Sequence, residues 1–129
     1  MDQGPLVREQ IAAGEKLIAE FSTYKPVAAA FWAKESESGN WYLYLASELI
    51  DDSTKHADYG VVLRLIGQQV WLDPFQVKVI SASDPIGRSV LDLVWKSHNL
   101  VPARCFSRRF GELSVDEAYI YAVQAATSV

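Results

Sequence analysis

The sequence predicts an α+β domain in which a single mixed sheet of about five strands packs mainly on one face against about three helices. Three segments carry apolar residues at helical spacing, and five short segments are rich in aromatic and β-branched residues between polar loops. Along the chain these segments follow the order α-ββ-α-β-α-ββ. The chain has 129 residues and contains no linker-like stretch, so we expect one globular domain over residues 1–129.

A helix followed by two strands is predicted in the first third of the chain. Apolar residues recur at spacings of four, seven and three over residues 5–21, which indicates a helix, and Pro5 suits its first position. Residues 27–35 and 41–50 are rich in aromatic and aliphatic side chains. They flank a polar loop at 36–40 that contains glycine, so we expect the two strands to form a hairpin.

The middle of the chain predicts a second helix, a strand and a third helix. Residues 55–70 carry an apolar stripe at helical spacing, and residues 75–81 alternate between apolar and polar side chains. Asp84 and Pro85 then form a helix start, which places the third helix at residues 85–98.

The last two strands are predicted at residues 103–108 and 113–123, and we expect a second hairpin there. Each of the two middle helices connects one strand to the next, an arrangement typical of a parallel crossover. We therefore expect the strands on either side of each of these helices to run parallel.

The composition limits the classes of partner and location. Sixteen acidic residues against 12 basic residues give a net charge of −4, which on average repels nucleic acid and anionic membranes. Cys105 is the only cysteine, so a disulfide within one chain is excluded. No apolar run reaches the 18 or more residues that a membrane helix needs. We expect a cytoplasmic protein without a membrane segment.

Residues able to act in catalysis are few. His56 and His98 are the only imidazole bases, and both fall at predicted helix ends, where a structural role explains them. No nucleotide-binding glycine motif and no zinc-binding motif is present. We expect no catalytic residue, no metal and no cofactor, and the sequence favours, without establishing, a protein that is not an enzyme.

Tyrosines are the feature of this sequence that most needs an explanation. Tyr42 and Tyr44 share one face of the second strand, and Tyr119 and Tyr121 share one face of the last strand. If the aliphatic residues of both strands face the helices, the four tyrosines lie together on the opposite side of the sheet. There a helix covers them as core, a second copy of the chain packs on them, or nucleic-acid bases stack on them.

Self-association is the leading hypothesis for function. A sheet face with four tyrosines is too apolar to stay bare, so we expect a small interaction module that forms a homodimer through this face. A different protein partner is a further possibility. On this hypothesis, Tyr44→Glu and Tyr121→Glu should separate the dimer and leave the fold intact.

The alternative function is binding of nucleic acid or a phosphate group, in which the tyrosines act together with arginines. Residues 88–109 carry five cations and one acid, a net charge of +4 in a chain that is otherwise acidic. Strand alternation predicts that Arg104 and Arg108 share a face. The candidate anion-binding residues are Arg88, Arg104, Arg108 and Arg109.

Overall fold

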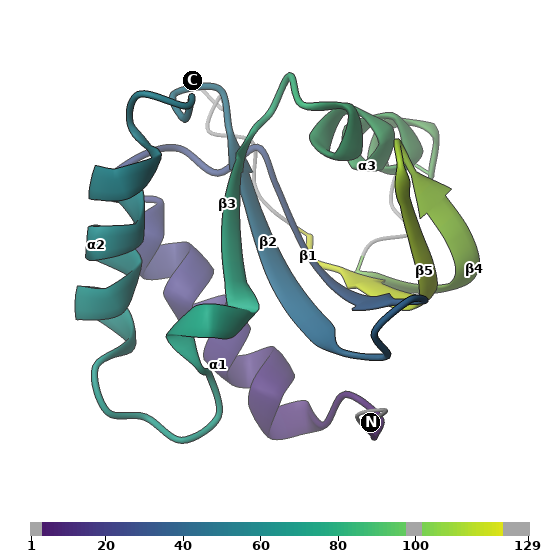
Figure 1. Ribbon diagram of the computed structural model, residues 1–129, viewed down its shortest axis with the longest axis horizontal. Coiled ribbons are helices and arrows are strands. Elements are labelled where there is room, and N and C mark those ends of the chain that lie inside the picture. The colour runs from purple at the N-terminus through teal and green to yellow at the C-terminus, as the bar shows by residue number, and fades with distance from the viewer. Residues whose placement is uncertain (1–3, 98–101, 123–129) are drawn as a thin grey trace.

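A five-stranded mixed sheet in the order β3-β2-β1-β5-β4 organises the computed structural model, which describes residues 4–97 and 102–122. The elements in chain order are α1 (Arg8–Phe21), β1 (Ala29–Glu35), β2 (Trp41–Ser47), α2 (Lys55–Ile66), the short 3-10 helix η1 (Pro74–Gln76), β3 (Val77–Ser81), α3 (Pro85–Ser97), β4 (Ala103–Phe110) and β5 (Leu113–Ile120). Figure 1 shows α1 and α2 on one side of the sheet and α3 on the other. The predicted fold class and element order are confirmed.

The strand pairing confirms both hairpins and one of the two crossovers. β1 pairs antiparallel with β2, β4 pairs antiparallel with β5, and β2 runs parallel to β3 across α2. The predicted parallel crossover through α3 is wrong. β5 pairs antiparallel with β1, so its hairpin partner β4 lies at the edge opposite β3 and runs in the opposite direction. α3 therefore crosses over the sheet between its two edges.

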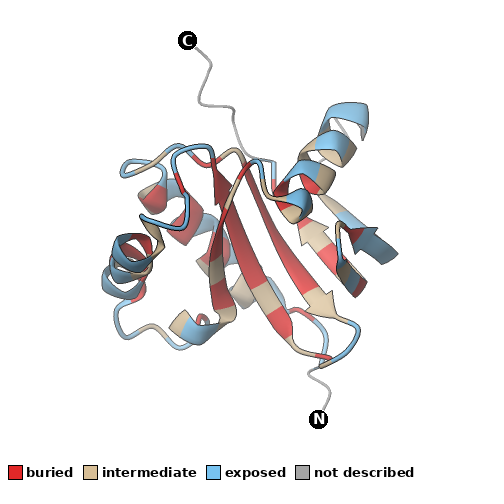
Figure 2. Cartoon of the chain, turned by 45° about the horizontal axis from the view of Figure 1, so that its top comes forward, coloured by how far each residue is buried: buried red, intermediate tan, exposed pale blue. Residues whose placement is uncertain are grey.

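Alternation along the central strands divides the core into two layers. Trp32 of β1 and Leu43 of β2 pack in the layer under α1 and α2. Phe31 and Tyr44, their neighbours in sequence, pack in the layer under α3. Figure 2 shows that the central strands are buried along most of their length, whereas the helices expose their outer sides. Because both faces of the sheet are covered, β1 and β2 read as nearly continuous apolar runs.

Two element ends differ from the sequence prediction for local reasons. α1 begins at Arg8 rather than at Pro5, and Gln10 accepts a hydrogen bond from the backbone of Val7. Phe75, expected in the third strand, lies in η1 because Asp73 accepts a hydrogen bond from the Phe75 backbone and Pro74 starts the turn. The predicted ends of the third helix and the last strand, at residues 98 and 123, lie outside the described residues.

The end of α2 also differs from the prediction. The helix stops at Ile66 instead of continuing to residue 70, since Gly67 takes a left-handed backbone conformation with φ of 58°. Glycine adopts this conformation without the steric cost that other residues carry. The segment that follows therefore leaves the helix and leads to η1.

One hydroxyl group fixes α1 to the middle of the sheet. The Tyr121 hydroxyl accepts a hydrogen bond from Trp32 Nε1 at 2.9 Å and donates one to the Ile11 carbonyl at 2.8 Å. Gly14 of α1 lies directly against this hydroxyl, and a Cβ atom at Gly14 would collide with it. The helix can approach β1 this closely only because residue 14 has no side chain.

Two helical glycines give a matched test of this packing. We expect Gly14→Ala to lower the free energy of unfolding by about 2 kcal/mol, because the added methyl displaces the buried Tyr121 ring. Gly60→Ala is the control, since a Cβ there meets nothing within 4 Å, and alanine should stabilise α2 by about 0.5–1 kcal/mol. Urea unfolding followed by circular dichroism measures both. Equal stability of the two variants would contradict the close approach at Gly14.

Candidate functional site

The four tyrosines do not form one face, so this part of the sequence prediction is wrong. Tyr42 and Tyr44 point to the layer under α3, whereas Tyr119 and Tyr121 point to the layer under α1 and α2. The error has a simple cause, which is that helices cover both faces of the sheet. β2 places its aliphatic residues under α1 and α2, and β5 places its aliphatic residues under α3.

Tyr44 and Tyr121 are core residues. Tyr44 is 2% exposed and stacks on Phe31 with ring centroids 4.9 Å apart, and Tyr121 is 5% exposed. Burial raises the pKa of both hydroxyls, because the interior of the fold disfavours the charged phenolate. Glutamate at either position would bury an unpaired charge. The expectation that Tyr44→Glu and Tyr121→Glu leave the fold intact therefore does not hold for this structure.

Tyr42 and Tyr119 are half-buried and lie beside cations on opposite faces of the sheet. The Lys78 ammonium lies 4.3 Å from the Tyr42 ring centroid. The Arg104 guanidinium lies 5.6 Å from the Tyr119 ring centroid. Each ring therefore has a charged neighbour from its own chain, an arrangement worth roughly 0.5–1 kcal/mol at exposed positions.

The predicted anion-binding arginines are dispersed, and Arg104 and Arg108 do not share a face. Residues an odd number apart normally point to opposite sides of a strand, yet Cys105 and Phe110 of β4 both pack in the layer under α3. Ser107 lies between them with a left-handed φ of 52°, which shifts the alternation by one residue. Arg104 accordingly points away from α3, where its Nη1 lies 2.6 Å from Glu117 Oε2.

Two of the arginines line the same hollow. Arg108 and Arg109 line a space between β4 and α3, and Lys96 of α3 joins them there. Arg88 lines a different hollow, together with Glu48. Lys96 is one of the five cations counted in residues 88–109 but was not among the predicted anion-binding residues, although its place in the last turn of the helix that precedes β4 was a signal for it.

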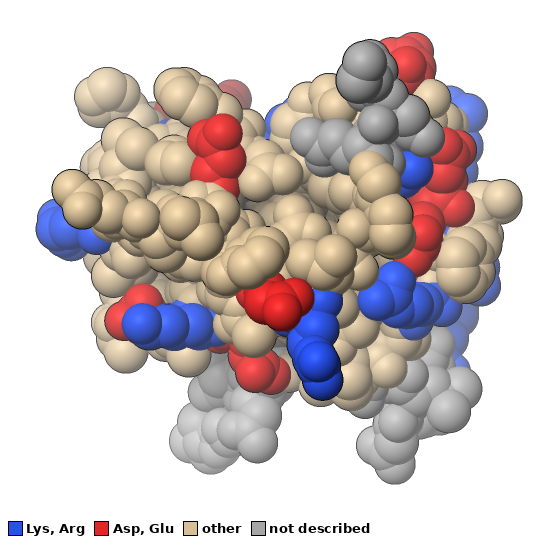
Figure 3. Space-filling view, turned by 90° about the horizontal axis from the view of Figure 1, so that it is seen from below, with Lys and Arg blue, Asp and Glu red and all other residues tan. Residues whose placement is uncertain are grey.

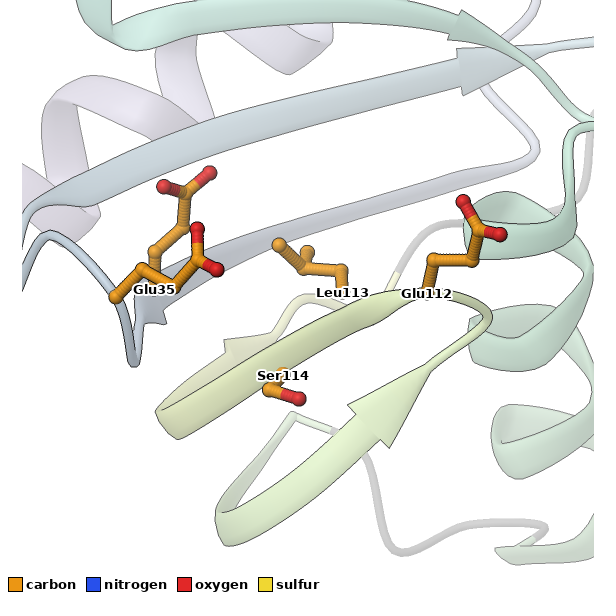
Figure 4. Close-up of a pocket in the computed structure, with 5 residues that line it drawn as sticks. Glu35, Glu112, Leu113 and Ser114 are labelled. Atoms are coloured by element: carbon orange, nitrogen blue, oxygen red, sulfur yellow. The ribbon is translucent and has the colours of Figure 1, made fainter.

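A small hollow near the hairpin turns is acidic. Glu35, Glu37 and Glu112 line it, together with Leu113 and Ser114, and its volume is about 150 Å³. Figure 4 shows Glu35 and Glu112 on opposite sides with Leu113 between them. Glu35 Oε2 lies 3.6 Å from Lys78 Nζ. Within residues 4–97 and 102–122, no three of the His, Cys, Asp and Glu side chains are placed to hold one metal ion.

A buried carboxylate connects the loop that follows α1 to the loop between β2 and α2. Asp58 of α2 is fully buried, and its Oδ1 lies 2.9 Å from Lys25 Nζ and accepts a hydrogen bond from the Tyr24 hydroxyl at 2.8 Å. Its other oxygen accepts a hydrogen bond from Thr54 Oγ1 at 2.7 Å, and Lys25 also donates to the Leu49 carbonyl. All of these polar groups have partners within the fold, so the cluster has a structural role.

The most unusual surface feature is an apolar groove between α2 and η1. The groove has a volume of about 340 Å³, and its walls are Tyr59, Val62, Leu63, Pro74, Phe75, Val77 and Lys78. Phe75 is 89% exposed and Leu63 is 55% exposed. Seen from below, a broad uncharged area lies on the side where Figure 1 shows α2 and η1, between scattered charges of both signs (Figure 3).

The groove lies at the outer edge of the sheet, where β3 is the last strand. The Tyr59 hydroxyl accepts a hydrogen bond from the Val79 backbone amide at 3.2 Å, so α2 satisfies part of the strand edge. A further strand would have to displace this contact. The groove was not expected from the sequence, because Phe75 fits the alternation of residues 75–81 and was placed in that strand. The sequence Asp73-Pro74 was the available signal, since it is typical of a turn.

Comparisons of the chain with protein-family models, with curated proteins and with solved structures found no match. None of the helices in the described part of the chain combines the length and the apolar character needed to cross a membrane.

The Asp58 cluster predicts the acid sensitivity of the fold. Burial raises the pKa of Asp58, but hydrogen bonds from Lys25, Thr54 and Tyr24 outweigh it, and the pKa lies below its ordinary value. The cluster therefore contributes stability fully above the unfolded pKa of about 3.9, and this contribution is lost as the pH falls through the folded pKa. Urea unfolding between pH 3 and pH 7 should show this loss.

Asp58→Asn should remove that pH dependence and lower the free energy of unfolding at pH 7 by about 3 kcal/mol, because Lys25 loses its charged partner. Asp52→Asn is the control, since the Asp52 side chain is fully exposed, and it should leave both quantities unchanged. An acid sensitivity as large in Asp58→Asn as in the wild type would contradict this assignment.

Proposed function

We propose that this protein is a small interaction module that forms a homodimer through the groove between α2 and η1. The observation that carries the proposal is the exposure of Phe75 beside an apolar hollow. Burying a phenylalanine side chain stabilises a protein by roughly 1.5–3 kcal/mol, and in the single chain this contribution is not used. Large exposed apolar surfaces on soluble proteins typically mark binding sites.

A second copy of the chain fits this surface because the projecting group and the hollow lie side by side. In an arrangement with two-fold symmetry, Phe75 of each protomer can enter the groove of its partner, so both copies gain the same contact. A heterologous partner would need its own matching ring and hollow. Self-association was also expected from the sequence, but through four tyrosines that the fold places on opposite faces of the sheet, two of them in the core.

The apolar surface has the composition of an interface centre. The large apolar side chains exposed on α2, η1 and the segment between them are Leu63, Val70, Trp71 and Phe75. Aromatic residues are enriched at interface centres and charged residues are depleted there. A stable interface buries about 800 Å² per partner, so these side chains would form its centre and polar neighbours its rim.

The cytoplasmic location expected from the sequence stays a prediction.

Sedimentation equilibrium of the wild type and of single variants tests the proposal. Phe75→Glu and Leu63→Glu should each weaken the dimer by at least about 30-fold, because a charge would occupy the interface centre. Both positions are exposed in the protomer, so the circular dichroism spectrum and the urea midpoint should change little.

Phe106→Glu is the matched control, since Phe106 is also a phenylalanine, 63% exposed, and lies on β4 at the opposite edge of the sheet. This variant should dimerise as the wild type does. The proposal would be overturned if the wild type stays monomeric at about 100 μM, since a dimer with a dissociation constant below this concentration would then be largely formed. Dissociation by Phe106→Glu but not by Phe75→Glu would assign the interface to the other edge and would also overturn it.

A further inference from the structure

A second surface feature, separate from the groove, concentrates positive charge. The hollow between α3 and β4 has a volume of about 360 Å³, and Lys96, Arg108 and Arg109 line it together with Asp92. Three cations and one carboxylate leave a local charge of +2, whereas the whole chain carries −4. Figure 1 shows α3 and the β4–β5 hairpin side by side at this end of the molecule.

The frame of this hollow is held by contacts between the hairpin turn and α3. The Gly111 backbone amide donates to Ser89 Oγ at 3.0 Å, and Ser89 Oγ donates to the Pro85 carbonyl at 2.9 Å. Gly111 has a left-handed φ of 62°, and a Cβ there would come within 3.0 Å of Pro85. Phe110 anchors the same turn in the core by an edge-to-face contact with Phe31.

The cations differ in how far the fold already uses them. Arg109 Nε donates to the Gly111 carbonyl at 3.1 Å, which orients the guanidinium. Its two Nη groups form no hydrogen bond or ion pair with the residues that the structure describes. Arg108 is exposed and forms no ion pair with any residue in the described part of the chain. Lys96 Nζ lies 3.1 Å from Asp92 Oδ2, and both side chains are largely exposed, so this pair is weak.

We propose that this hollow binds the phosphate group of a small phosphorylated molecule. Guanidinium groups present paired donors that match phosphate oxygens, and a pre-oriented guanidinium loses less entropy on binding. The volume of the hollow lies in the range of small-molecule sites. Binding of a nucleic-acid strand is less favoured, because Arg88 and Arg104 lie elsewhere and do not continue the positive surface.

Asp92 gives the proposal a distinctive signature. Its carboxylate repels an anion in the hollow and also competes for Lys96. Replacing Asp92 with asparagine should therefore strengthen phosphate binding several-fold and free the lysine. If these cations were only exposed to solvent and bound no phosphate, Asp92→Asn would not strengthen phosphate binding.

The experiment is a titration of the ¹⁵N-labelled protein with inorganic phosphate at low ionic strength, followed by amide chemical shifts. We expect saturable shifts centred on Gly111 and its neighbours. Arg108→Gln and Arg109→Gln should each weaken binding about tenfold, and Asp92→Asn should strengthen it. Arg104→Gln is the control, since Arg104 pairs with Glu117 on the other face, and it should change nothing.

Three outcomes would overturn the proposal. These are shifts that do not saturate, binding that is unchanged in both Arg108→Gln and Arg109→Gln, and saturable binding of a single-stranded oligonucleotide that also requires Arg88 or Arg104. Arg108 is exposed, and its side chain forms no hydrogen bond or ion pair with residues 4–97 and 102–122, so its variant tests the site even if Arg109→Gln perturbs the hairpin turn. Phe75→Glu should retain phosphate binding, which separates this site from the proposed dimer.

Discussion

The Tyr121 hydroxyl is the contact on which the arrangement of this fold most depends. It joins the end of the β5 segment to Trp32 in the central strand and to the Ile11 carbonyl of α1. Gly14 makes room for this contact, so α1 lies close against the sheet. With α1 placed, α2 packs beside it on the same face, and the Asp58–Lys25 ion pair ties α2 to the loop that leaves α1. The other face is left to α3.

Because helices cover both faces, the distinctive exposed surfaces lie at the two edges of the sheet. Each broad face is closed by helices, and the aromatic residues of β2 and β5 become core or half-buried residues. The exposed surfaces that remain distinctive lie at opposite edges. The β3 edge carries the apolar groove, and the β4 edge carries cations beside α3. An apolar surface favours a protein partner and a cationic one favours an anion, so the two edges suit different ligands.

The arginines of the basic segment, residues 88–109, make different contacts on different sides of the fold. Arg104 is engaged with Glu117 and Tyr119 on one face of the hairpin, while Arg108 and Arg109 serve the other side. Exposed arginines on an edge strand also discourage unwanted strand pairing, as does the irregular backbone at Ser107. The direction in which each side chain points therefore says more about which arginines can bind one anion together than the net charge of the segment does.

The sequence alone predicts the element order, both hairpins and the helix start at Asp84, because these follow from local periodicity and capping. The face that each tyrosine occupies depends on how the helices pack, since strand alternation defines two faces without saying which helix covers either. The same holds for Arg104 and Arg108, whose separation depends on the backbone conformation of Ser107. Phe75 was misplaced because alternation continued into a turn that Asp73 and Pro74 had already formed. Local patterns carry periodicity, but which helix covers which face is a property of the whole packed chain.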